Sequence, residues 1–100
     1  MNKKITVQIN IALKNFIPGY IQNRHNDIKN ILNALEQKDY ETIESVGHKM
    51  AGNGGAYGFD QISDIGLCIE KAAKDKNDKE IQKWQNVLMS YLDNLEIIYG

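Results

Sequence analysis

Residues 17–37 read IPGYIQNRHNDIKNILNALEQ, and apolar side chains return in this stretch at steps of three and four residues. That spacing places them along one side of an α-helix. The only proline of the chain, Pro18, lies at the start of the stretch. A proline is well tolerated there because the first N–H groups of a helix have no partner within it. We therefore predict a helix over residues 18–37 that buries one face.

Three further stretches show the same period: residues 40–57, residues 60–73 and a stretch that follows Asn77 and continues to Ile98. Their predicted N-terminal caps are Asp39, Asp60 and Asn77, the last in a capping box with Glu80. The connections between the four stretches are short and polar. Four amphipathic helices joined in this way fold most simply as an all-α, antiparallel up-down-up-down four-helix bundle.

The segment before the first helix has a different pattern. Apolar and polar residues alternate over residues 5–13, which is typical of a strand. No second strand is evident in the sequence, and a lone strand is not stable. We expect residues 1–11 to form a short extended lead-in that packs against the bundle, with a short helix around residues 12–16.

The composition limits the class of protein. One hundred residues, 42% hydrophobic and 25% charged, form one domain over residues 1–100. A net charge of −1 argues against general nucleic-acid binding, and no segment approaches the roughly 18 uninterrupted apolar residues of a membrane span. The single cysteine, Cys68, fits a reducing compartment. We therefore expect a cytoplasmic protein, and we expect it to be a monomer.

Residues 48–59, HKMAGNGGAYGF, are unusual for a bundle helix, because each interior glycine costs about 1 kcal/mol relative to alanine. At about 100° per residue, His48 lies nearly opposite the apolar face of its helix and is predicted to be exposed. Gly52 and Gly55, together with Ala51, are predicted to lie beside it. Such a strip would let the backbone of another protein approach the imidazole closely, because no Cβ stands in the way.

Other interpretations of this stretch remain open. A glycine-rich run is often a loop, and a lone histidine is often an ordinary surface residue. In an unrelated four-helix adaptor, the glycines would serve only close helix packing. The helical period continues to Tyr57, which favours a helix over a loop, and Lys49 directly after His48 is a cation suited to phosphate. The run lacks the Gly-Lys-Ser/Thr ending of a nucleotide-binding loop.

At these residues the sequence resembles the histidine phosphotransfer (HPt) family. The residues that match the family motif in order are His48, Met50, Gly52, Gly54, Gly58 and Phe59. The resemblance extends to residues 17–24 and 69–73, so it spans most of the chain. One position departs from the family pattern: Ala51 stands where the family usually has a lysine, so Lys49 is the candidate replacement for the phosphate-binding cation.

The resemblance implies a phosphohistidine formed at Nε2 of His48, with Glu70 as the hydrogen-bond acceptor that orients the ring through Nδ1. It also implies that the protein is a carrier and not an enzyme, and that it shuttles a phosphoryl group between aspartates of receiver domains. The expected partners are response-regulator receiver domains and a hybrid sensor histidine kinase. We expect no cofactor and no metal site in the chain itself, since His25 and Cys68 are isolated; Mg²⁺ is expected on the partner receiver domain only.

A docking surface for these partners is predicted around His48. It comprises Ala51, Gly52, Gly55, Ser63, Leu67, Lys71 and Lys74. The lysines would attract an acidic receiver pocket. The alternative function is a degenerate HPt-like module that only binds signalling partners, which Ala51 makes possible. Arg24 lies on the apolar face of its predicted helix, and we expect it to pair with a carboxylate or to extend to the surface.

Overall fold

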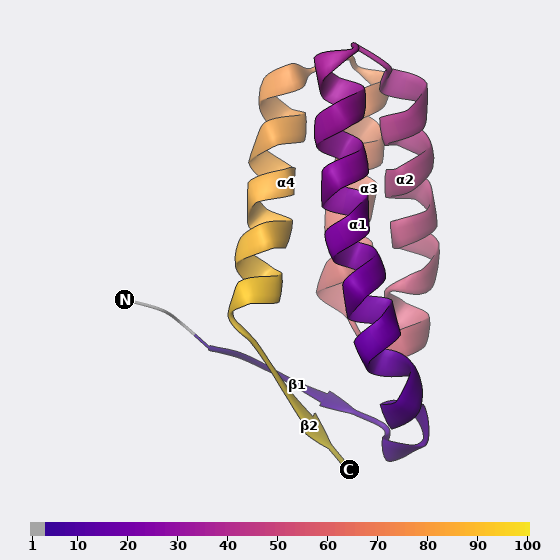
Figure 1. Ribbon diagram of the computed structural model, residues 1–100, viewed down its shortest axis with the longest axis vertical. Coiled ribbons are helices and arrows are strands. Elements are labelled where there is room, and N and C mark those ends of the chain that lie inside the picture. Colours follow the sequence, from indigo (N-terminus) through magenta and orange to yellow (C-terminus); the bar gives the residue numbers. More distant parts are fainter. Residues whose placement is uncertain (1–3) are drawn as a thin grey trace.

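Four helices form the body of the protein in a computed structural model that describes residues 4–100. They are α1 (Ile17–Glu36), α2 (Tyr40–Asn53), α3 (Asp60–Lys74) and α4 (Asp78–Asp93), and they run alternately up and down side by side (Figure 1). Two short 3₁₀ helices lie beside them, η1 (Ile11–Phe16) and η2 (Gly55–Tyr57). The predicted all-α four-helix bundle is confirmed, and η1 matches the short helix expected around residues 12–16.

The helix starts follow the capping chemistry of the sequence at two of the three predicted positions. Asp39 accepts a hydrogen bond from the backbone N–H of Thr42 at 3.2 Å, and Asn77 accepts one from that of Glu80 at 3.2 Å. The prediction that Asp60 caps α3 is wrong, because Phe59 occupies the N-cap position and Asp60 is the first helical residue. The Asp60 carboxylate still lies in the first turn, where the helix dipole favours negative charge.

One apolar core runs through the bundle, and each helix contributes one face to it. Its largest fully buried side chains are Ile9, Ile17, Ile31, Ile43, Met50, Phe59, Ile62, Ile69, Ile81 and Leu88. Phe59 stacks on Tyr20 with ring centroids 5.5 Å apart, which fixes the turn between α2 and α3 against α1. The middle of α2 and the middle of α3 are therefore both packed in this core.

The two ends of the chain pair with each other, which the sequence did not predict. β1 (Ile5–Ile9) and β2 (Leu95–Tyr99) form a two-stranded parallel sheet with Ile5 opposite Leu95, and the sheet lies beneath one end of the bundle (Figure 1). The predicted continuation of the last helix to Ile98 is wrong, since α4 ends at Asp93. The lead-in does pack on the body, where Ile9 is buried, but as a strand with a partner.

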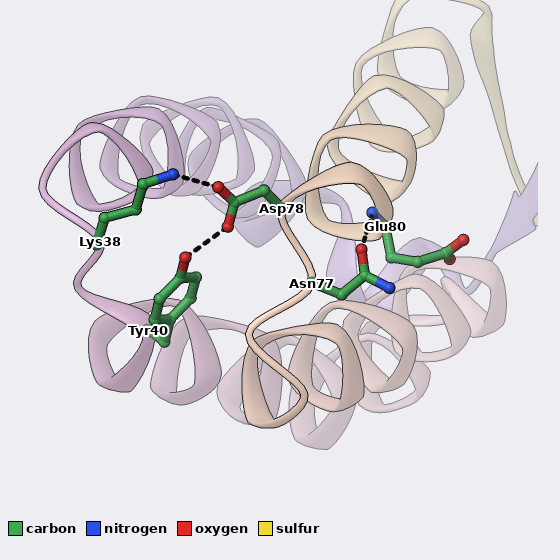
Figure 2. A network of polar contacts seen from close by, with 5 residues as sticks. All are labelled: Lys38, Tyr40, Asn77, Asp78 and Glu80. Carbon is green, nitrogen blue, oxygen red and sulfur yellow. Dashed lines mark hydrogen bonds and ion pairs between the residues drawn. The ribbon is translucent and has the colours of Figure 1, made fainter.

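The opposite end of the bundle is tied by side chains instead of strands. The Asp78 carboxylate at the start of α4 binds the Lys38 ammonium and accepts a hydrogen bond of 2.6 Å from the Tyr40 hydroxyl (Figure 2). Lys38 lies in the turn between α1 and α2, so these contacts join that turn to the start of α4. The bundle is thereby held at both ends, and its middle carries the candidate site.

Candidate functional site

His48 lies on the outer side of α2, and its side chain is 76% exposed. Met50, two residues on, is buried on the opposite side of the helix. The predicted exposure of the imidazole therefore agrees with the structure. An imidazole this exposed is accessible to another protein.

Glu70 of α3 lies directly beside the imidazole. Its Oε2 is 3.0 Å from Nδ1 of His48, and the Glu70 side chain is only 16% exposed. An ionised carboxylate can only accept hydrogen bonds, so Nδ1 carries the proton in this pair. In the neutral imidazole this tautomer places the free lone pair on Nε2, the ring nitrogen that does not contact Glu70. The two residues that the resemblance paired are in contact, while the role of the contact remains a prediction.

Two glycines that the sequence interpretation passed over bring these side chains together. A Cβ on Gly47 would lie 2.7 Å from the backbone nitrogen of Glu70 and 2.8 Å from the carbonyl oxygen of Gly66. A Cβ on Gly66 would lie 2.5 Å from the backbone nitrogen of Ala51. The backbones of α2 and α3 therefore touch, directly beside His48. The available signal was the cost of a glycine inside a helix, which often has a packing reason.

The glycine run after His48 is only partly helical. α2 ends at Asn53, so the prediction that it continues to residue 57 is wrong. Gly54 is buried, and a Cβ there would lie 2.6 Å from the backbone nitrogen of Ser63. Gly58 has φ +91°, a left-handed conformation that favours glycine, and it lies against Ile9. Backbone geometry and close packing, which the helical period cannot detect, end the helix early.

The predicted side-chain-free strip is therefore smaller than expected. A Cβ on Gly52 would have nothing within 4 Å, so this residue does leave open space on the His48 side of the molecule. Gly55 is exposed but belongs to η2, and its N–H donates a hydrogen bond of 2.8 Å to Oγ of Ser63. Ala51 is half-buried against Gly66. Ser63, another predicted docking residue, therefore already uses its hydroxyl for a hydrogen bond within the protein.

Three of the four predicted docking residues on α3 are exposed, and the fourth, Ser63, is half-buried. Leu67 is 56% exposed, and Lys71 and Lys74 reach solvent on the same helix. Nζ of Lys74 is 3.8 Å from Oε2 of Glu70, the same oxygen that lies beside His48. The carboxylate thus lies between an imidazole and an ammonium group. This contact was not predicted from the sequence.

Lys49 is exposed, and its charge also acts on α1. Burial raises the pKa of the Asp27 carboxyl, and the Arg24 guanidinium and, less strongly, the Lys49 ammonium oppose that rise. Lys49 is one residue after His48, which turns it about 100° around the helix from the imidazole. The predicted phosphate cation is therefore near the site, but it also lies within the electrostatic reach of an acidic residue of α1.

An open hollow of about 450 Å³ lies next to the imidazole. It is lined by Glu41, Glu44, Ser45, His48 and Glu70. Glu41 and Glu44 were not singled out in the sequence. The sequence could have indicated them, because they precede His48 by seven and four residues, and residues so spaced share a helix face.

A buried polar cluster holds the C-terminal end of α2 against α1. Arg24 is 7% exposed, its Nε lies 2.8 Å from Oδ2 of Asp27, and its guanidinium lies over the Tyr20 ring at 4.4 Å. Oδ1 of Asn53, the last residue of α2, accepts hydrogen bonds from Nη1 of Arg24 at 3.1 Å and from the Tyr20 hydroxyl at 3.0 Å. The expectation that Arg24 pairs with a carboxylate is confirmed.

An exposed histidine in the middle of a bundle helix, with a carboxylate of the next helix at its inner nitrogen, is the arrangement expected of a histidine phosphocarrier domain. The comparison with family models gives the particular family. The model of the Hpt domain matches residues 19–96, and the chain belongs to this family. Hpt domains are phosphocarrier modules of two-component signalling and not catalysts. No curated protein and no solved structure matched the chain.

Two further features bear on what the domain can bind. Over residues 4–100, no helix is both long and apolar enough to cross a membrane. In the same part of the chain, no three side chains of the types His, Cys, Asp and Glu are grouped so that they could hold a metal ion. The absence of a cofactor remains a prediction.

Proposed function

We propose that this protein is a phosphorelay histidine phosphotransfer protein that carries a phosphoryl group on Nε2 of His48 between aspartates of receiver domains. The observation that carries the proposal is the exposed imidazole whose Nδ1 lies 3.0 Å from Oε2 of Glu70, within a chain that belongs to the Hpt family. Exposure gives access to a partner, and the carboxylate contact selects the reactive tautomer.

The chemistry follows from that tautomer. Glu70 accepts a hydrogen bond from Nδ1–H and so holds the proton on that nitrogen, which leaves the Nε2 lone pair free to attack the phosphorus of an aspartyl phosphate. The new bond joins Nε2 to phosphorus, and the bond between phosphorus and the aspartate oxygen breaks to release the carboxylate. Donation to a second aspartate reverses these bonds. The carboxylate at Nδ1 stabilises the positive charge that the ring gains in the phosphorylated form.

The partners in this proposal are response-regulator receiver domains and a hybrid sensor histidine kinase in the cytoplasm. The receiver domain supplies Mg²⁺ and most of the electrostatic stabilisation that phosphoryl transfer needs. Gly52 and Leu67 are the exposed small and apolar elements of the docking surface, and Lys71 adds positive charge on α3. The carrier itself provides a positioned nucleophile.

Ala51 supports a second candidate, a module that binds signalling partners without carrying phosphate. No lysine is present at this position, three residues after His48; the residue is half-buried, and its backbone lies against Gly66. In this alternative, His48 is a contact residue only. The surface that would bind a receiver domain is the same in both cases.

Phosphoryl transfer from a radiolabelled receiver domain separates the two candidates. The carrier function predicts acid-labile, base-stable label on the wild-type protein and none on His48→Gln, while both proteins bind the receiver equally. Label that persists on His48→Gln would rule out this site. Binding without label on either protein, across the receivers of the same genome, would support the binding-only module.

A further inference from the structure

We propose that the hollow beside His48 raises the free energy of the phosphorylated protein, so that this carrier passes the phosphoryl group on instead of storing it. The inference rests on the proposed function, since it concerns the phosphohistidine at the same nitrogen. It adds a direction: the equilibrium is displaced toward the acceptor aspartate. The residue that we assign to this effect is Glu44, with a smaller contribution from Glu41.

The charge around the hollow has one sign. Glu41, Glu44 and Glu70 line it together with Ser45 and the imidazole, and within the described residues no lysine or arginine forms part of this lining. Glu44 precedes His48 by four residues, which places their Cβ atoms about 6 Å apart on one helix face. Glu70 is in contact with the ring itself. A phosphoryl group on the exposed imidazole therefore lies close to carboxylates.

Two lysines near the site also interact with carboxylates. Nζ of Lys74 lies 3.8 Å from the Glu70 carboxylate, so this ammonium offsets a charge that is already present. Lys49 forms no ion pair among the described residues, and its charge acts at longer range on Asp27 of α1, whose ion-pair partner is Arg24. The charge of Glu44 has no such ion-pair partner in the part of the chain that the structure describes.

Electrostatics gives the direction and the size of the effect. A phosphoryl group carries between one and two negative charges near pH 7. Its repulsion by a carboxylate about one helical turn away, in a solvent-exposed site, changes the equilibrium constant by about threefold to tenfold. Transfer to an aspartate of another protein breaks the bond between Nε2 and phosphorus and removes this repulsion. The carrier is therefore a better donor than a neutral surface would make it.

The test uses phosphoramidate as the phosphoryl donor, so it needs no partner protein. Phosphoramidate and His48 give phosphohistidine and ammonia, and in a fixed excess of ammonium the ratio of phosphorylated to free protein reports the equilibrium constant. ³¹P NMR measures this ratio for the wild type and Glu44→Gln. The matched control is Glu36→Gln, which removes an equal charge from an exposed glutamate next to the Lys38–Asp78 end of the bundle.

The inference predicts a threefold to tenfold higher phosphorylated fraction for Glu44→Gln at low salt, no change for Glu36→Gln, and a smaller difference in 1 M salt. Equal ratios for all three proteins, or equal increases for both variants, would overturn it. In those cases label on His48 would still support the proposed function. Absence of any label on His48 would overturn both proposals.

Discussion

Five of the six glycines in α2, α3 and the turn between them fall into two groups with opposite surroundings. At Gly47, Gly54 and Gly66 an added Cβ would lie less than 3 Å from backbone atoms of the neighbouring segment. At Gly52 it would meet nothing within 4 Å, and at Gly55 only side chains at 3.5 Å or more. The same residue type therefore serves close backbone packing in one group and open surface in the other. Which of the two applies depends on the segment that lies against the glycine.

The two groups have separable consequences for the carrier. The buried glycines let the backbone of α3 reach α2 next to His48, and so bring the Glu70 carboxylate to 3.0 Å from the imidazole. The open Gly52 affects only the approach of another molecule. Substitutions in the first group should change stability and ring orientation together. Substitutions in the second should change partner binding and leave the ring orientation as it is.

The largest effect is expected for Gly66→Ala. The new methyl group would lie 2.5 Å from the backbone nitrogen of Ala51 and 2.8 Å from the carbonyl oxygen of Gly47, and neither atom can rotate aside. The helices must move apart, which we expect to lower the free energy of unfolding by about 2–3 kcal/mol despite the better helix propensity of alanine. Urea denaturation followed by circular dichroism measures this loss. A change below about 0.5 kcal/mol would contradict the close-contact interpretation.

Glu70→Ala tests the orientation of the His48 ring separately from the close packing of the buried glycines. The substitution leaves the backbone contact with Gly47 intact and removes the acceptor at Nδ1 together with the exposed ion pair to Lys74. We expect phosphoryl transfer to slow by about tenfold, because the ring loses its fixed tautomer, while the bundle remains folded. Stopped-flow or quenched-flow assays of transfer from a phosphorylated receiver measure the rate. Glu70→Gln is the matched control, since its amide oxygen can still accept the hydrogen bond from Nδ1–H; an unchanged rate for Glu70→Ala would remove the orienting role.

The end of the bundle at Lys38, Tyr40 and Asp78 offers a contrast, because charge holds it instead of close backbone contact. Hydrogen bonds from Lys38 and Tyr40 lower the pKa of the Asp78 carboxyl. A folded-state pKa below the unfolded value stabilises the protein above the unfolded pKa, and the contribution is lost as the pH falls through the folded pKa. Asp78→Asn should therefore destabilise at pH 7, and its effect should diminish as the pH falls below the ordinary pKa of an aspartate.

Thermal unfolding of the wild type and Asp78→Asn between pH 2.5 and pH 7 measures this difference. Gly66→Ala is the control, because a steric clash does not titrate and its cost should stay constant over the range. A pH-independent difference for Asp78→Asn would show that its hydrogen bonds do not depend on the carboxylate charge.

Much of this architecture was accessible from the sequence, because it is local. The helical period located all four helices, and Asp39 and Asn77 cap two of them as predicted. The pairing of β1 with β2 was missed because it joins segments at opposite ends of the chain, and no local pattern reports a parallel partner. Leu95 and Ile98 fit the spacing of a helix as well as that of a strand, so the helix predicted from the sequence extends beyond the end of α4 at Asp93.

The site divides in the same way. The motif around His48 and the family resemblance predicted the exposed ring and its contact with Glu70, both of which lie where they were expected. The exposure of a glycine depends on which helix packs against it, and this information lies in another segment. For that reason Gly47 and Gly66 were missed, and the open strip was assigned too many residues.

The smallest effect is expected for Gly52→Ala, which is also the most direct test of the exposed group. Alanine replaces glycine at an exposed position inside α2, where nothing lies within 4 Å of the new methyl group, so stability should rise by about 0.5–1 kcal/mol. If a receiver domain approaches the strip beside His48, the added methyl group obstructs it. The Michaelis constant for the receiver should then rise a few-fold while the maximal transfer rate changes little, since the imidazole and Glu70 are untouched.

Chemical labelling by phosphoramidate, which needs no docking, should proceed as in the wild type. A stabilised variant with unchanged receiver kinetics would show that the partner binds elsewhere on the His48 face, and Leu67 would be the next position to test.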